Sequence, residues 1–88
     1  MKTVHKFSLA QAGIIRLPLA FTLRHAADQL GTHCAWIELD TSHETFEREI
    51  IKLATGAPLP QDPMPPIFIG TVLESHGQFV WHYYARRA

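Results

Sequence analysis

The sequence has a single cysteine, no net charge and no long hydrophobic run. Cys34 cannot form a disulfide within its own chain, which favours a reducing cytoplasm over a secreted, disulfide-braced scaffold. Eight Lys and Arg residues balance eight Asp and Glu residues, so the chain lacks the broad charged field that gathers or imitates nucleic acid phosphates. The apolar stretch after Lys6 is interrupted by Gln11 and Arg16. We therefore predict a cytoplasmic protein with no export signal that binds neither nucleic acid nor a membrane.

Sequence patterns typical of catalysis and metal binding are also missing. Six histidines occur among 88 residues, but none is spaced as H-x-H or H-x-x-x-H. His33 is next to Cys34, and neighbouring side chains of a strand point to opposite faces, so the two cannot form a nucleophilic pair locally. The segment "TGAPLPQDPMPP" has too many prolines to supply the free backbone amides that cradle a phosphate. We expect no metal site, no cofactor and no enzymatic activity.

Two stretches alternate apolar and polar residues with the period of a strand. "VHKFSL" and "CAWIELD" each place every second side chain on one face. The residues that share a face are His5, Phe7 and Leu9 in the first stretch, and Ala35, Ile37 and Leu39 in the second. Alternation alone therefore predicts two half-buried strands.

The C-terminal third predicts a β-hairpin. The runs "IFIGTVLE" and "QFVWHYY" are rich in β-branched and aromatic residues and are separated by "SHG", where Gly77 can adopt positive φ. A turn at His76 and Gly77 gives a register that pairs Gly70 with Tyr83, Thr71 with His82, and Leu73 with Val80. In this register Gly70 lies open beneath the ring of Tyr83.

Both faces of this hairpin are too apolar for a sheet that shows one side to water. One face carries Ile69, Thr71, Leu73, Val80, His82 and Tyr84, and the other carries Val72, Phe79, Trp81 and Tyr83. One interpretation is that the core and the rest of the chain cover the two faces. The other is that the face with Trp81 and Tyr83 contacts a second molecule, because Trp and Tyr are enriched at interfaces.

Two middle segments have local signals of helices. In "TSHETFEREIIKLATGAP", Thr41 and Glu44 have the spacing of a capping box, and Gly56 follows as a stop. In "LAFTLRHAADQLG", leucines and alanines recur near helical spacing before Gly31. Local signals alone predict an α+β fold with helices near residues 20–30 and 43–54.

Six pieces of the chain occur in a characteristic order: "VHKFSL", "LP" at Leu17 and Pro18, "HCAWIELD", "TGAPLPQDP", "FIGTV" and "GQFVWHYY". In this order and spacing the chain resembles, almost end to end, an uncharacterised family of small proteins from tailed bacteriophages. The positions that match the pattern are Cys34, Trp36, Gly56, Pro58, Gly70, Gly77 and His82. The chain departs from the pattern at "RHAADQL", where the family has β-branched alternation, and at Ala57, where it has a histidine.

The resemblance implies strands where local signals favour helices. We therefore predict a single mainly-β domain over residues 1–88, an antiparallel β-sandwich or partly open barrel of about five to six strands. The α+β fold is the alternative. The resemblance does not assign an activity to any residue of this chain.

The resemblance and the surplus of aromatic residues predict a small phage accessory protein that binds a bacterial host protein, for example a defence component such as a CRISPR effector. The candidate binding residues are Trp81, Tyr83, Tyr84, Pro58 and Pro60. Of these we expect Trp81 to lie in the core, and Tyr84 and the proline-rich loop to supply exposed contacts. We also expect a homodimer when no host partner is present. Two alternatives are a small-molecule sequestering protein and a minor virion component.

Overall fold

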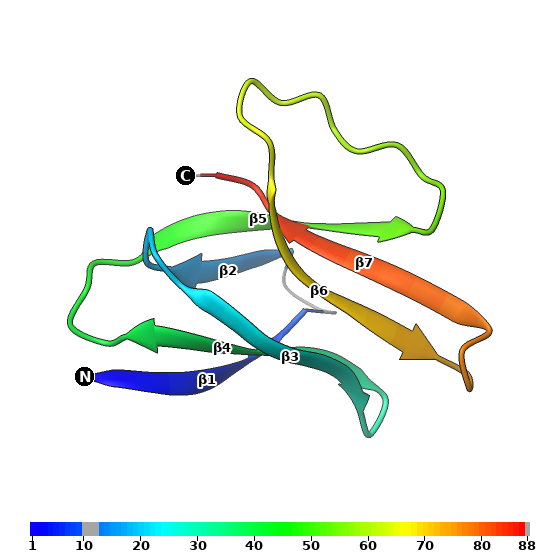
Figure 1. Ribbon diagram of the computed structural model, residues 1–88, viewed down its shortest axis with the longest axis horizontal. Helices are drawn as coiled ribbons and strands as arrows, with labels where there is room; N and C mark the ends of the chain where they lie inside the picture. The colour runs from blue at the N-terminus through cyan, green and yellow to red at the C-terminus, as the bar shows by residue number, and fades with distance from the viewer. Residues whose placement is uncertain (10–12, 88) are drawn as a thin grey trace.

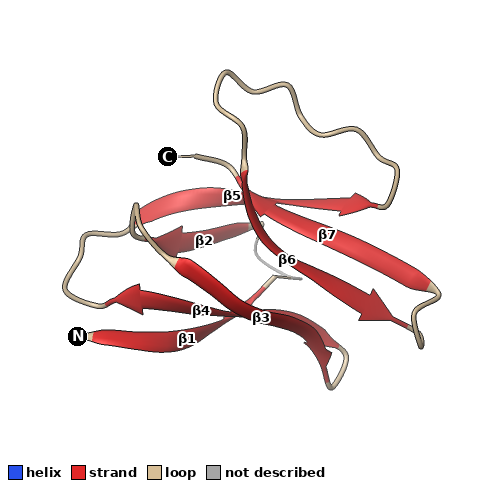
Figure 2. Cartoon of the chain, viewed as in Figure 1, coloured by secondary structure: helices blue, strands red, loops and turns tan. Residues whose placement is uncertain are grey.

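The computed structural model describes residues 1–9 and 13–87, and the elements in these residues are all strands (Figure 1, Figure 2). They are β1 (Lys2–Ser8), β2 (Ile14–Leu17), β3 (Thr22–Gln29), β4 (Thr32–Asp40), β5 (Phe46–Ala54), β6 (Ile67–Glu74) and β7 (Phe79–Ala85). Every pairing is antiparallel, in a three-stranded sheet of order β1-β4-β3 and a four-stranded sheet of order β2-β5-β7-β6. The predicted mainly-β fold is confirmed, with seven strands instead of five or six.

The alternative with helices near residues 20–30 and 43–54 is wrong, because these segments form β3 and β5. β5 is hydrogen-bonded on both sides, to β2 and to β7. Its side chains alternate accordingly: Arg48 is buried, whereas Glu47 and Glu49 are exposed. Pairing with strands distant in the sequence outweighs the helical propensity of the segment, and the capping-box spacing at Thr41 has no helix to cap.

The β6–β7 hairpin has the predicted register near its tip. Gly70 pairs with Tyr83, and the pairing continues without a shift to Glu74 and Phe79 beside the turn. The register shifts between Phe68 and Gly70, which the alternation does not predict. As a result Ile69 is fully buried instead of lying on the outer face with Tyr84, because one extra residue on a strand reverses the alternation.

The core lies between the two sheets. Its largest fully buried side chains are Tyr83, Leu17, Ile37, Ile69, Val72 and Pro18. β4 supplies the predicted face of Ala35, Ile37 and Leu39. The sheets meet where β3 lies against β6, as Figure 1 shows.

Gly70 makes this close approach possible. A Cβ atom at Gly70 would collide with the Cβ of Ala26 on β3, and Gly70 has a φ of 142°, which side chains with a Cβ rarely adopt. The space above Gly70 is thus occupied by β3, although the ring of Tyr83 was the predicted neighbour.

Candidate interaction surface

The tips of the β3–β4 and β6–β7 hairpins lie at the same end of the molecule (Figure 1). His33 follows the first tip, Glu74 precedes the second, and His33 Nε2 lies 3.1 Å from Glu74 Oε1. Three exposed apolar side chains on these two hairpins, Leu30, Leu73 and Phe79, are called the hairpin end below. A direct polar contact therefore holds the two tips beside each other.

A polar network that is buried at His33 and Tyr83 and partly exposed at Glu74 stands behind the hairpin end. His33 Nδ1 lies 2.7 Å from the hydroxyl oxygen of Tyr83, and the two rings are perpendicular with centroids 5.8 Å apart. Trp81 Nε1 donates to the same carboxylate oxygen of Glu74, at 3.1 Å. Because a carboxylate only accepts, His33 Nε2–H donates to Glu74, which leaves Nδ1 as the ring nitrogen that is hydrogen-bonded to the Tyr83 hydroxyl. The network fixes the orientation of both hairpins.

Burial and the charge of Glu74 both disfavour ionisation of the Tyr83 phenol. Burial is the larger cause, and together they raise the pKa of Tyr83 to about 12 from an ordinary value of 10.0. Tyr83 therefore stays a neutral donor to His33 over the whole physiological range.

Leu30 is in an unfavourable environment for a leucine. It is completely exposed at the tip of β3–β4, with a φ of 51° in a two-residue turn closed between Gln29 and Thr32. Such a turn favours Asn or Gly at this position, and the left-handed conformation costs other residues about 1–2 kcal/mol. Leu30 makes no buried contact that would offset this cost, so folding stability does not explain why a leucine occupies this position.

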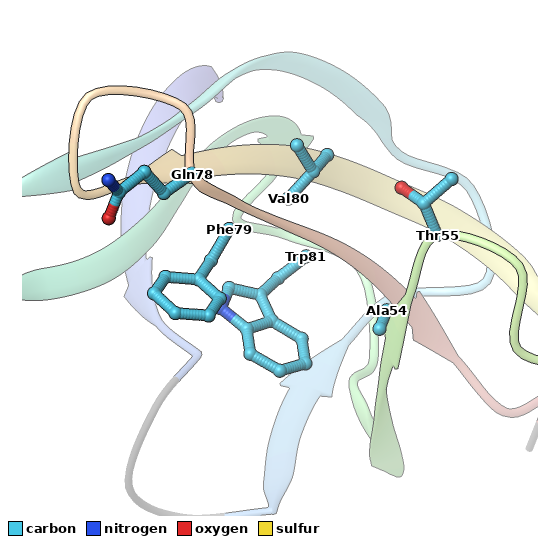
Figure 3. A pocket seen from close by; sticks show the side chains of 6 residues that line it. All are labelled: Ala54, Thr55, Gln78, Phe79, Val80 and Trp81. Atoms are coloured by element: carbon cyan, nitrogen blue, oxygen red, sulfur yellow. The ribbon is translucent and has the colours of Figure 1, made fainter.

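Leu73 and Phe79 extend the apolar surface onto the second hairpin. Leu73 is 62% exposed and Phe79 is 51% exposed. Figure 3 shows the ring of Phe79 beside that of Trp81, on the same side of β7, in a groove of about 250 Å³ lined by Ala54, Thr55, Gln78, Phe79, Val80 and Trp81. Phe79 and the groove therefore lie together next to the turn, and Leu73, which pairs with Val80, is exposed on the opposite face of the same hairpin.

Trp81 is packed against the core on one side and open to this groove on the other. The ammonium group of Lys52 lies 4.4 Å from the centroid of its ring, a favourable cation–π contact. The prediction of a core residue thus holds for only part of the side chain, because β7 extends past the opposite sheet toward the tip.

The outer face of β5, β6 and β7 has a second groove, of about 170 Å³, beside the start of the proline-rich loop. It is lined by Leu53, Ala54, Thr55, Gly56, Ala57, Leu59, His82 and Tyr84. The loop is tied to the C-terminal segment, where Arg86 pairs with Asp62 and Arg87 Nε donates to the carbonyl of Pro65 at 2.8 Å. Part of the outer face remains uncovered, since Phe68 is 45% exposed.

The five predicted binding residues do not form one surface. Tyr83 faces the opposite sheet and is fully buried, so it lies outside the exposed surface. Trp81 borders the groove next to the hairpin end. Tyr84 lies on the outer face, where the groove it lines includes the residues on either side of Pro58. Pro58 is exposed and Pro60 is half-buried in the same loop.

Sequence reasoning missed Leu30, Leu73 and Phe79 as surface residues. The signal for Leu30 was available: a leucine directly before Gly31 in "DQLGT" occupies a turn position that favours Asn or Asp. Helical spacing in the same segment competes with this signal.

Within residues 1–9 and 13–87, no three His, Cys, Asp or Glu side chains are grouped to hold a metal ion. Cys34 is 2% exposed, and its thiol donates to the carbonyl of Thr32 at 3.5 Å. The same residues contain no helix of the length and apolarity needed to cross a membrane.

These features define a small all-β protein of two packed antiparallel sheets, with apolar side chains exposed at one end. The whole chain, residues 1–88, matches the family described as a domain of unknown function (DUF7352), and the protein belongs to that family. The expected membership of an uncharacterised family is thus confirmed. Searches of curated proteins and of solved structures find no match.

Proposed function

We propose that this protein acts by binding another protein through the hairpin end. The observation that carries the proposal is Leu30, which is fully exposed in a left-handed turn conformation. Local strain that brings no packing is typical of functional positions. A leucine at the tip of a rigid hairpin can enter an apolar pocket of a partner at little cost in entropy.

The surroundings of Leu30 support this role. Phe79 and the open side of Trp81 add aromatic surface on the second hairpin, whose tip lies at the same end of the molecule, and aromatic residues supply much of the binding energy at protein interfaces. The contact between His33 and Glu74 holds the two hairpins in one orientation before binding. A preorganised surface loses less conformational entropy when a partner docks.

We further propose that the partner is a bacterial host protein, such as a component of a defence system. This part rests on the sequence resemblance to a family from tailed bacteriophages. The protein would then act in the cytoplasm of an infected bacterium, by occupying a surface of its target and without catalysis.

A quantitative pull-down from host lysate tests the binding surface. Wild-type protein should retain a stoichiometric partner, and Leu30→Asn and Phe79→Ser should lose it. Val4→Thr is the matched control, because Val4 is also an exposed apolar residue, on β1, with 47% exposure. Retention by both hairpin variants, or no stoichiometric partner for wild type, would overturn the proposal. Loss with Met64→Gln alone would instead assign binding to the proline-rich loop.

A second copy of the chain is the simplest partner to test. Light scattering at concentrations well above micromolar distinguishes a dimer from a species of 10.0 kDa. If a homodimer forms through the hairpin end, Leu30→Asn should convert it to monomer, and Val4→Thr should not.

Small-molecule sequestration is a second candidate, favoured by one groove. About 520 Å³ of space is lined by Leu19, Ala20, Ser42, His43, Glu44 and Phe46, a size common for ligand sites. Native mass spectrometry of protein purified from infected cells tests it. A bound molecule that is lost with Phe46→Ala would support sequestration, and bare protein would count against it.

A further inference from the structure

We propose that Thr55 is a nucleophilic hydroxyl that accepts an acyl group, with His82 as its general base. The site lies on the outer face of the four-stranded sheet and does not depend on the proposed binding function. Thr55 Oγ1 lies 2.7 Å from His82 Nε2. Thr71 Oγ1 lies 3.0 Å from the other ring nitrogen, Nδ1.

The strand register brings these three residues together. His82 pairs with Thr71 on β6 and with Leu53 on β5, so the side chains of His82, Thr71 and Leu53 lie on the same outer face of the sheet. Thr55 follows Leu53 by two residues and stays on that face. A turn closed by a hydrogen bond of 3.0 Å from the Ala57 amide to the Ala54 carbonyl holds Thr55 in place. Gly56 has the φ of 94° that this turn requires.

The arrangement has the three parts of an activated hydroxyl. When His82 Nδ1–H donates to the hydroxyl oxygen of Thr71, Nε2 is the unprotonated nitrogen and accepts from Thr55 O–H. In this tautomer Thr71 is a positioning residue that orients the ring, although its hydroxyl can also donate to Nδ1 and so does not by itself select the tautomer. Because Thr71 is neutral and does not stabilise the imidazolium as a carboxylate would, the site is suited to activated acyl donors.

The groove next to Thr55 matches a short acyl chain. It holds about 170 Å³, and its apolar walls include Leu53, Leu59 and Tyr84. Thr55 is exposed and His82 is half-buried, so a donor can reach the hydroxyl while the ring is partly shielded from water. The chemical class that fits is an activated ester or thioester of a small aliphatic acid.

The transfer step needs no further reactant. Thr55 Oγ1 attacks the carbonyl carbon of the donor, and the hydroxyl proton moves to His82 Nε2. When the tetrahedral intermediate collapses, the bond to the leaving oxygen or sulfur breaks, and the leaving group takes the proton from His82. The products are an ester on Thr55 and a free alcohol or thiol, with no change of oxidation state.

Incubation with p-nitrophenyl butyrate, followed by peptide mass spectrometry, tests the site. We expect a butyryl group on Thr55, together with release of an equivalent amount of p-nitrophenol. Thr55→Ser should keep the label, and Thr55→Val should abolish it. His82→Gln should slow labelling about 100-fold or more, the usual contribution of a general base. Thr22→Val is the control, because Thr22 is an exposed threonine on β3.

Two further readouts separate a positioning role from a structural one. Thr71→Asp should accelerate labelling by stabilising the imidazolium, and Thr71→Val should slow it, while circular dichroism of both stays that of the wild type. The rate in wild type should fall when His82 is protonated at low pH, and this dependence should disappear in His82→Gln. Butyryl groups spread over other residues, or equal labelling of Thr55 without His82, would overturn the proposal.

Discussion

His33 Nε2 on β4 lies 3.1 Å from Glu74 Oε1 at the end of β6, which joins the three-stranded sheet to the tip of the opposite hairpin. The same ring is hydrogen-bonded at Nδ1 to the buried hydroxyl of Tyr83, at 2.7 Å. A polar network in which every group is satisfied rigidifies the elements that carry it. It therefore fixes the relative position of the two hairpins whose tips form the proposed binding surface.

Tyr83→Phe should lower the free energy of unfolding by about 1–3 kcal/mol, because it leaves the His33 ring buried with one unpaired nitrogen. Urea unfolding measures the change. Tyr84→Phe is the control, since the Tyr84 hydroxyl has no hydrogen bond to the residues that the structure describes. An equal loss in both variants would contradict the importance of the network.

Gly70→Ala should destabilise the protein by more than Gly31→Ala. Both residues have positive φ, so both substitutions introduce strain of about 1–2 kcal/mol. Only Gly70 has a neighbour in the way, the Cβ of Ala26, whereas a Cβ at Gly31 meets no atom within 4 Å. The double variant Gly70→Ala with Ala26→Gly should recover part of the loss in thermal unfolding. No recovery would show that the clash is unimportant.

Leu30→Asn should stabilise the protein by about 1 kcal/mol, because Asn tolerates the left-handed conformation and no buried contact is lost. For a domain of this size, the melting temperature should rise by about 4–8 °C. Leu30→Ala is the matched control, since it removes the apolar side chain but keeps the backbone strain. A melting temperature that falls in Leu30→Asn would mean that Leu30 supports folding.

The protein should lose stability at alkaline pH through Tyr83. Its pKa is about 12 in the folded chain, chiefly because of burial, compared with 10.0 ordinarily. Below pH 10.0 the Tyr83 phenol is protonated in both the folded and the unfolded chain, so its full contribution to stability is present. Between the two values only the folded state binds it, so the free energy of unfolding falls as pH rises. Urea titrations across this window should show the decline in wild type and a weaker one in Tyr83→Phe.

Parts of the fold could be predicted from short-range pattern alone. The alternation through Ala35, Ile37 and Leu39 identifies the buried face of β4, because the side-chain period of a strand is two. The turn residues around Gly77 set the register of β6–β7 near its tip, because the length of a hairpin loop fixes which residues pair. The register shift before Gly70 lay outside this logic, because a glycine inside a strand often marks a bulge but does not say which residue is the extra one.

The identity of β3 and β5 required partners distant in the sequence. Residues 20–30 and 43–54 have helical spacing and capping signals, and the family resemblance, not local propensity, indicated strands. β5 is a strand because β2 and β7 bind both of its edges. A local signal worth a few tenths of a kcal/mol per residue cannot compete with this pairing and burial.

The sequence by itself determined which strands carry an apolar face and where the last hairpin turns, because both depend on neighbours a few residues apart. Only the tertiary structure decided which aromatic residues are exposed. It buried Tyr83 against His33, 50 positions away, and left Trp81 half-buried. The physical reason is that burial depends on which sheet covers which face, and that is set by contacts between segments far apart in the chain.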